Sequence, residues 1–292
     1  MILKTKFYKG LPRKRLSRSV TGDVGVFIFL VIIAFFMVLP LIYIVSNSLK
    51  PYNELFLFPP KILVNNPTFD NYNDLFYLIS SSWVPFSRYL LNTVFITIVG
   101  TLGNVFFGSL AAFAISKIKF PGHKFCFALI VLSLMFSNAV TQIPNYLIIA
   151  KLGWIDTYLA LIIPALQSSL GLYLMKQFID QIPDVLLEAA SIDGASDLKK
   201  YLVIVMPTVK PAWLTVVILS IQSLWNTTGA DYIFSEQLKT LPVAMNQIVL
   251  GGIARAGAGA AVSVVMLSVP VISFILSQSQ IIETMTTSGM KE

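Results

Sequence analysis

The chain has 292 residues, of which 56% are hydrophobic and only 12% are charged. That apolar share is above the usual share of soluble domains, so the composition excludes an ordinary soluble protein and indicates a membrane protein. The single cysteine, Cys126, excludes an internal disulfide and a cysteine metal cluster. No Walker A pattern occurs in the sequence. We therefore expect no metal and no cofactor bound by this chain, and any ATP must be held by another chain.

The net charge of +7 is concentrated at the start of the chain, where seven basic residues precede residue 20 and an apolar run comes next. Basic residues next to a membrane span mark its cytoplasmic side and attract anionic lipid head groups. We therefore predict a basic cytoplasmic tail over residues 1–23 that contacts the lipid bilayer, and we expect no nucleic-acid partner.

Six stretches are long and apolar enough to cross a membrane, since about 20 apolar residues span the ~30 Å hydrocarbon layer as a helix. They lack the period-2 alternation of barrel strands, and only helices or closed barrels satisfy their backbone in lipid. Loops on the predicted inner side carry more Lys and Arg than outer loops, which places both termini in the cytoplasm. The sequence thus predicts an all-α membrane protein with six transmembrane helices, over residues 24–45, 89–116, 125–150, 157–178, 211–230 and 256–282.

The predicted segments divide the chain into four parts. These are a basic tail, the first span with its external loop, a core transmembrane domain and a short cytoplasmic tail, over residues 1–23, 24–87, 88–283 and 284–292. The polar, Pro-rich external loop is too long for a simple connection, so we expect it to have structure of its own. Small residues such as Gly100 and Gly103 recur in the second span and permit close helix packing, so this helix should be central.

Polar side chains occur within the third, fourth and fifth predicted spans, and the fourth has Gln167, Ser168 and Ser169 midway. Asn138, Gln142 and Asn145 are spaced four and three residues apart, so they share one helix face. Gln222 and Asn226 lie near the outer end of the fifth predicted span. Polar groups at this depth are costly unless they are paired or face water. Two interpretations stay open: hydrogen bonds between helices, each worth about 1 kcal/mol or less, or the lining of a hydrophilic passage.

A charged stretch between two apolar spans organises the second half of the chain. Residues 188–211 read EAASIDGASDLKKYLVIVMPTVKP. Pro183 stands where a helix can begin, because its missing N–H would be unpaired in the first turn anyway. Gly194 suits a turn, since glycine accepts a positive φ, and Asp193 or Ser196 could cap a second helix. We predict a helix, a tight turn and a second helix at the membrane surface.

This stretch resembles the EAA loop of permease subunits in ABC importers, with Met206 standing where a leucine is usual. The external loop is similar to that of the smaller permease of maltose-type sugar importers, through Ser48-Leu49-Lys50-Pro51 and Pro59-Pro60. The resemblance covers nearly the whole chain and implies the type I ABC importer permease fold, with a cytoplasmic coupling-helix loop. In that family the loop docks in a groove of a cytoplasmic ATP-binding subunit. The coupling residues that it implies are Glu188, Ala189, Ala190, Asp193, Gly194 and Pro207.

The resemblance also implies partners, a substrate class and a location. The partners are a second homologous permease, two cytoplasmic ATP-binding subunits that hold ATP and Mg, and an extracellular or periplasmic solute-binding protein. Together they would import a sugar or oligosaccharide across the bacterial cytoplasmic membrane, with this chain as a non-catalytic subunit. The larger partner permease of the family can carry most of the sugar contacts. Candidate pathway residues in this chain are Asn138, Gln142, Asn145, Gln222 and Asn226.

Two other classes of function compete with an importer. An ion-coupled secondary transporter normally needs ionisable groups inside the bilayer, and a membrane-embedded enzyme needs catalytic groups at depth. The interior of every predicted span lacks Asp, Glu, Lys, Arg and His. This pattern disfavours both classes. A sodium site made of hydroxyls and carbonyls stays open, as does a membrane scaffold protein without an ATPase partner.

Overall fold

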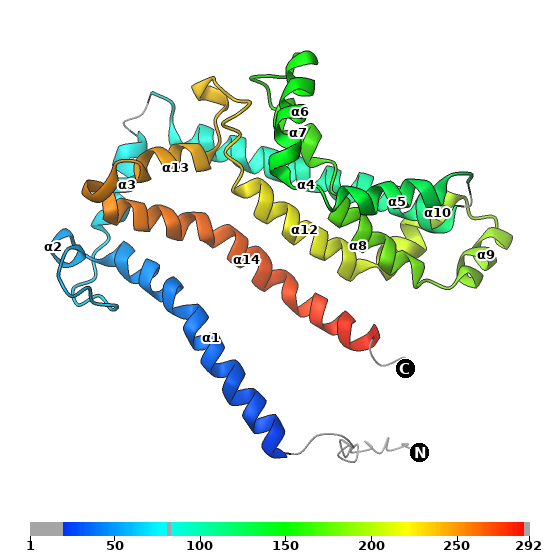
Figure 1. The fold of residues 1–292 in the computed structure, drawn as a ribbon, viewed down its shortest axis with the longest axis horizontal. Coiled ribbons are helices and arrows are strands. Elements are labelled where there is room, and N and C mark those ends of the chain that lie inside the picture. The colour runs from blue at the N-terminus through cyan, green and yellow to red at the C-terminus, as the bar shows by residue number, and fades with distance from the viewer. Residues whose placement is uncertain (1–19, 81–82, 119, 289–292) are drawn as a thin grey trace, which may run out of the picture.

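The computed structural model describes residues 20–80, 83–118 and 120–288, and within these ranges the chain is helical without a β-strand (Figure 1). Of the two predicted tails, over residues 1–23 and 284–292, residues 1–19 and 289–292 lie outside the described ranges. Residues 20–23 and 284–288 are helical, as parts of α1 and α14, so the helices extend beyond the predicted span limits. The longest helices are α1 (Val20–Leu49), α4 (Phe86–Lys117) and α14 (Ala256–Ser288). Shorter α-helices are α2 (Tyr52–Leu55), α3 (Asp70–Ser80), α5 (His123–Ser133), α6 (Asn138–Lys151), α7 (Leu159–Ala165), α8 (Ser169–Asp180), α9 (Asp184–Ile192), α10 (Asp197–Lys200), α11 (Met206–Thr208), α12 (Lys210–Trp225) and α13 (Leu241–Val249). A π-helical turn (Tyr201–Val205) and two 3₁₀ turns (Glu236–Leu238 and Gly252–Arg255) complete the described elements.

Four stretches of the described chain are long and apolar enough to cross a membrane: Gly22–Leu49, Phe86–Lys117, Leu159–Asp180 and Ala256–Gln278. A fifth is counted if the pair Asp197–Thr208 and Lys210–Trp225, which is bent by 80°, forms one span. The bend lies at Val209, between two prolines whose missing N–H groups weaken the helical hydrogen bonds. An all-α membrane architecture is therefore confirmed, whereas the predicted number of six spans is not.

The third predicted span, residues 125–150, is wrong as a single helix. It consists of α5 and α6, separated by residues 134–137, and α5 alone is only roughly 16 Å long at 1.5 Å per residue. Ser137 at the start of α6 has an extended backbone, with ψ of 152°. Ser and Asn side chains compete with the helix for backbone hydrogen bonds, so a break before Asn138 is physically reasonable. Apolar composition alone could not reveal it.

Helix α4 is the centre of the molecule, as we predicted from its small residues. It packs against α7, α8 and α12. A Cβ atom added at Gly103 would lie 2.1 Å from Leu166 Cδ2, and one at Gly100 would lie 2.7 Å from Leu224 Cδ1. At these two glycines, an added side chain would force the neighbouring leucines to move, so the glycines favour the close approach of the helices.

The loop that connects α1 to α3 is an ordered structure with buried charges, in agreement with the expectation that it has structure of its own. Lys50 is 3% exposed, and its Nζ donates to Asn47 Oδ1 at 2.6 Å and to the Lys61 carbonyl at 2.5 Å. Glu54 is also buried, and its Oε2 accepts a hydrogen bond from the backbone N–H of Asn65 at 3.0 Å. These bonds tie the two sides of the loop together.

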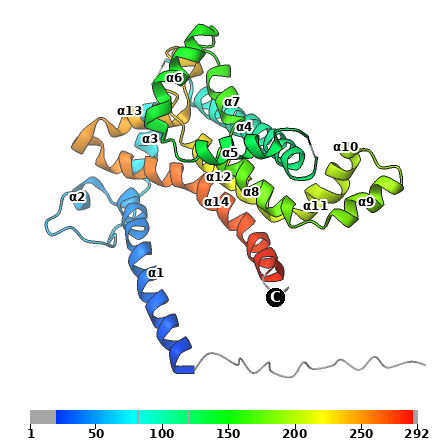
Figure 2. The same ribbon diagram turned by 45° about the vertical axis from the view of Figure 1, so that its right-hand side comes forward.

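The two ends of the molecule are built differently. Helices α2, α3 and α13 gather at one end, and α9 and α10 lie at the opposite end in both views (Figures 1 and 2). Helix α1 runs along α14 near the first end and then diverges from the bundle. Its apolar side chains are mostly exposed, Phe36 by 71%, as is suitable for contact with lipid or another subunit.

Candidate functional site

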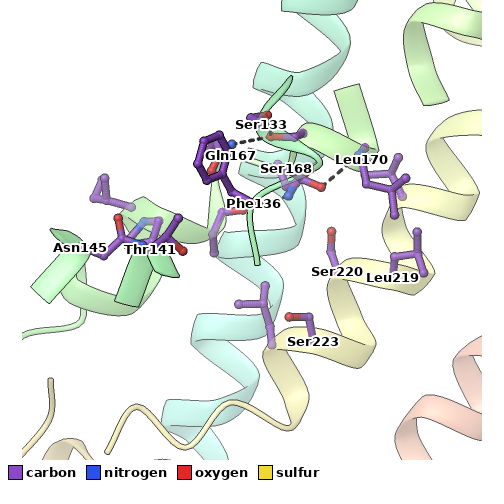
Figure 3. Close-up of a pocket in the computed structure, with 18 of the residues that line it drawn as sticks. Ser133, Phe136, Thr141, Asn145, Gln167, Ser168, Leu170, Leu219, Ser220 and Ser223 are labelled. Atoms are coloured by element: carbon purple, nitrogen blue, oxygen red, sulfur yellow. Dashed lines mark hydrogen bonds between the residues drawn. The ribbon is translucent and has the colours of Figure 1, made fainter. Parts of the chain in front are cut away.

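A polar pocket of about 840 Å³ lies beside α4, between the α5–α6 segment, the α7–α8 segment and α12 (Figure 3). Phe136 and Trp154 contribute aromatic surface to its wall. Among the lining residues none is charged. Its polar lining consists of Asn104, Ser133, Thr141, Asn145, Gln167, Ser168, Ser169, Ser220 and Ser223.

The pocket forms where two helix breaks meet. Ser133, at the end of α5, donates from Oγ to Ser169 Oγ at 2.6 Å, and Gln167 Nε2 donates to the same atom at 2.9 Å. Ser168 caps α8, because its Oγ accepts the N–H of Gly171 at 3.0 Å. Irregular backbone at membrane depth is tolerated where it is buried in protein or lines a water-filled cavity. The paired breaks therefore favour a hydrophilic cavity over a lipid-facing surface.

Helix α4 supports this arrangement from one side. Asn104 lies in the pocket wall, and its Nδ2 donates to the carbonyl of Ala165 at 2.9 Å. Ala165 is the last residue of α7, and the carbonyls of a helix end lack intrahelical partners. Asn104 thus pairs a carbonyl that the break in the helix exposes.

The structure places the five predicted pathway residues in different surroundings. Asn145 lines the pocket, whereas Gln142 is exposed and donates from Nε2 to Asp231 Oδ2 at 2.9 Å. Gln222 and Asn226 lie at the end of α12 outside the pocket wall, and Asn226 Nδ2 donates to the Gln222 carbonyl at 2.8 Å. Asn138 begins α6, but its side chain lies outside the described residues.

Sequence reasoning missed most of the pocket's hydroxyl groups. The available signal was the run Gln167-Ser168-Ser169 in the middle of the fourth predicted span, since three consecutive polar residues there indicate a break. Ser133 and Ser220 gave no comparable signal, because isolated serines are common in transmembrane helices and often bond to their own backbone.

The second candidate site, residues 183–209, is named here the coupling island. Helix α9 begins after Pro183, Gly194 has a φ of +79°, and Ser196 caps α10 by accepting the N–H of Lys199 at 3.4 Å. The predicted helix, tight turn and second helix are confirmed. Of the two predicted caps, Ser196 is the one used.

The outer face of the coupling island is exposed and partly apolar. Five of the six predicted coupling residues are exposed, and Ala190 is half-buried. Large apolar side chains stand among them, including Ile192, which is 87% exposed, and Leu198, which is 60% exposed. The exposed predicted residues are Glu188, Ala189, Asp193, Gly194 and Pro207.

The inner face of the coupling island is fixed to the helix bundle. Leu187 and Tyr201 are buried in one apolar cluster with Phe113 of α4 and Ile179 of α8. The hydroxyl of Tyr201 lies 2.6 Å from Ser109 Oγ, and its ring centroid lies 5.7 Å from that of Phe113. The island is therefore anchored on one side and open on the other.

On the opposite side of the molecule, Asp156 joins two loops. Its Oδ1 accepts the N–H groups of Phe234 at 3.0 Å and Ser235 at 2.8 Å, and its Oδ2 accepts the Ser235 hydroxyl. The Ser235 side chain and these N–H groups hold the pKa of Asp156 below its usual value, because they stabilise the charged form. No group of three His, Cys, Asp or Glu residues in the described part of the chain is placed to hold a metal ion.

No protein-family model matches the chain, but relatives are evident. It is 31% identical over 230 residues to the polygalacturonan/rhamnogalacturonan transport system permease protein YtcP of Bacillus subtilis, with 78% of each chain covered. It is 30% identical to the inner membrane ABC transporter permease protein YcjP of Escherichia coli, covering 91% of this chain and 94% of the relative. The trehalose transport system permease protein SugB of Mycobacterium tuberculosis is 28% identical, with 88% of this chain and 93% of the relative covered.

The fold is similar to a chain in the crystal structure of a bacterial ABC transporter involved in the import of the acidic polysaccharide alginate. The TM-score is 0.76 at 21% sequence identity, and the match covers 90% of this chain and 98% of that chain. A second structure, of the alginate transporter in complex with an alginate pentasaccharide-bound periplasmic protein, matches with a TM-score of 0.60 at 16% identity. Both matches show that the fold of this chain is similar to theirs, and they show nothing beyond the fold.

Proposed function

The chain belongs to the permease proteins of ABC transporters, and on this premise we propose that it forms part of the path of a sugar or oligosaccharide in an ATP-driven importer. The observation that carries the proposal is the two-sided coupling island, whose inner face is anchored to α4 and α8 while its outer face is exposed. An exposed face with Ile192 and Leu198 beside Glu188 has the mixed character of a protein interface.

We infer that the exposed face docks in a groove of a cytoplasmic ATP-binding subunit. Glu188 makes a polar contact there, Ala189 and Ala190 permit close approach, and Gly194 allows the turn between the two helices. Two such subunits hold ATP and Mg, and they bind this chain and a second homologous permease. ATP shifts the pore between inward- and outward-facing states because it binds with different affinity to the two.

The polar pocket supplies this chain's part of the substrate path. Hydroxyl and amide side chains such as Asn145 and Ser223 suit the hydroxyls of a sugar, and Phe136 and Trp154 suit its apolar ring faces. The carbohydrate names of several relatives support the same substrate class. A solute-binding protein delivers the sugar from outside the bacterial cytoplasmic membrane, in which both termini of the chain face the cytoplasm.

The first test is purification of the full chain from its native membrane in mild detergent, with identification of co-purifying proteins and an assay of ATP hydrolysis. We expect an ATP-binding subunit and a second permease, with the ATP-binding subunit lost on Glu188→Lys. Asp74→Lys is the matched control, because Asp74 is an exposed carboxylate on α3 at the opposite end of the molecule. A chain that purifies alone and moves solute down an ion gradient would overturn the proposal.

A further inference from the structure

The last residues of α4 are hydrogen-bonded to the segment that enters the coupling island. Lys117, the last residue of α4, donates from Nζ to the carbonyl of Ile182 at 2.6 Å and to Asp184 Oδ1 at 2.7 Å. The side chain of Lys117 is only 9% exposed, whereas that of Asp184 is 69% exposed, so the bond to the Ile182 carbonyl is the more shielded of the two. The preceding residue, Ser116, donates from its hydroxyl to Asp180. Two adjacent residues of α4 thus contact the connection between α8 and α9.

The same helix also contacts the exit from the coupling island. Tyr201 comes directly after α10, and it bonds Ser109 and packs on Phe113 of α4. Ser109, Phe113 and Lys117 are spaced four residues apart, so they lie on one face of α4. The segment that enters the coupling island and the segment that leaves it therefore both contact this face of α4.

Helix α4 continues without a break from the coupling island to the polar pocket. Asn104 lines the pocket thirteen positions before Lys117, roughly 20 Å away at 1.5 Å per residue. The segment that leaves the coupling island is connected to the pocket through α12, and an 80° bend separates that segment from α12. Helix α8 also connects the pocket wall at Ser169 to the entry of the island at Asp180. Helix α4 differs from it in contacting both the segment that enters the island and the segment that leaves it.

We propose that α4 is a lever that carries the movement of the coupling island to the pocket, and that Lys117 is the positioning residue that holds the island to the lever. This rests on the proposed function, since it needs an ATP-binding subunit to move the island. Lys117 acts through Ile182 and Asp184, and it is not among the residues that line the polar pocket. The clamp requires a donor that reaches both a carbonyl and a carboxylate, which Lys and Arg supply and Met does not.

The test measures whether ATP changes access to the pocket, so it needs no knowledge of the sugar. Cys126 is the single cysteine of this chain and is exposed, so Cys126→Ser with Ser223→Cys leaves this chain one thiol, in the pocket wall, and labelling is read on this chain after the subunits are separated. The complete transporter, with partner permease and ATP-binding subunits, is placed in liposomes. The rate of maleimide labelling is then compared without nucleotide and with ATP and vanadate.

In the reporter protein, which has Cys126→Ser and Ser223→Cys and is otherwise unchanged, we expect ATP to change the labelling rate about fivefold or more, as for an allosteric coupling of ordinary size. Lys117→Met abolishes this response while the ATP-binding subunits still co-purify, and Lys117→Arg restores it. Lys124→Met is the matched control and keeps the response, because Lys124 is exposed on α5. A normal response in Lys117→Met, or loss of the ATP-binding subunits from it, overturns the lever. A reporter protein that never responds to ATP, with Lys117 in place, instead counts against the proposed function itself.

Discussion

The loop after α1 and the coupling island are both polar interruptions of an apolar chain, but they are built in opposite ways. The loop after α1, predicted to be external and called here the external loop, buries two of its charged side chains. Lys50 and Glu54 are held by hydrogen bonds to the loop backbone and to Asn47 at the end of α1. The coupling island exposes its apolar side chains, among them Ile192 and Leu198. The polar groups of the first region are therefore paired within this chain, while the second region exposes the kind of surface that binds another protein.

The difference separates two kinds of contribution to the protein. Changes in the external loop should alter the stability of the chain, because removing one member of a hydrogen-bonded pair leaves the other member without that partner. Changes on the outer face of the coupling island should leave the isolated chain unaffected and alter its association. Substitutions in each region, together with a change of pH, test this separation, starting from the largest expected effect.

The first prediction concerns Ile192→Asp in the coupling island. An 87% exposed side chain contributes little to folding, so the isolated chain should keep its stability. If Ile192 is an anchor of the interface, the change weakens binding of the ATP-binding subunit by about 2–4 kcal/mol, or thirtyfold and more. The dissociation constant in detergent measures this effect.

Leu250→Asp is the control for Ile192→Asp. Leu250 is 83% exposed and lies at the end of α13, at the other end of the molecule. The Leu250→Asp variant should bind the ATP-binding subunit with the same dissociation constant as the parent chain. Equal binding by both variants would mean that the apolar face of the coupling island is not the interface.

The second prediction concerns Lys50→Met in the external loop. The change removes the charged donor to Asn47 and to the Lys61 carbonyl, and a hydrogen bond that involves a charged group contributes about 1.5–3 kcal/mol. The loop should then be cut faster by protease, while binding of the ATP-binding subunit stays unchanged. Lys61→Met is the matched control, because the hydrogen bond from Lys50 uses the backbone of Lys61, which this change keeps. Equal protease resistance of Lys50→Met and the parent would show that the buried lysine is dispensable.

The contrast between these regions also explains how far the structure could be predicted from sequence. The coupling island was predictable because its signals are local: Pro183 begins a helix, Gly194 turns the chain and Ser196 caps the second helix. The central place of α4 was predictable from Gly100 and Gly103, since small residues in a membrane helix permit close packing of neighbouring helices.

The pocket could be predicted only in part, because it depends on which segments meet in space. The break between α5 and α6 is stabilised by Ser133 bonding to Ser169, 36 residues away in the chain. Gln142 shares a sequence pattern with Asn145, yet it pairs with Asp231, 89 residues away. Periodicity predicts which residues share a face and gives no information about what that face meets.

The third prediction concerns Gly194→Asp, which should uncouple transport from ATP hydrolysis without preventing membrane insertion. Gly194 has a φ of +79° with no atom within 4 Å of an added Cβ, so the change costs about 1–2 kcal/mol of backbone strain and no clash. It also places another carboxylate next to Asp193 on the docking face. Uptake into vesicles and ATP hydrolysis, measured together, give the ratio that should fall.

Gly122→Asp separates strain from position. Gly122 also has a positive φ, +93°, and open surroundings, but it precedes α5 and is outside the coupling island. This variant should have the same local strain and keep the ratio of transport to hydrolysis. If both variants lose it equally, the effect is general destabilisation.

The last and smallest effect is a pH dependence confined to the external loop. The N–H of Asn65, with further hydrogen bonds from Asn66, holds the pKa of Glu54 below its ordinary value, against the opposing effect of burial. A carboxyl whose pKa is lower in the folded than in the unfolded state contributes stability above its unfolded pKa. That contribution is lost as the pH falls through the folded pKa. Acidification from about pH 7 to about pH 3, which is below ordinary carboxyl pKa values, should therefore loosen the loop.

Hydrogen exchange of the peptides over residues 50–66, corrected for the intrinsic effect of pH, measures this loosening. Glu54→Gln is the control: it has no titrating group, so exchange in this loop should be faster than in the parent at neutral pH and should change less on acidification. The coupling island, whose inner contacts to α4 include the Tyr201–Ser109 hydroxyl pair, should not show the Glu54 titration. If exchange in the loop shows the same pH dependence with Gln at position 54, another group controls the loop and the buried carboxylate does not stabilise it.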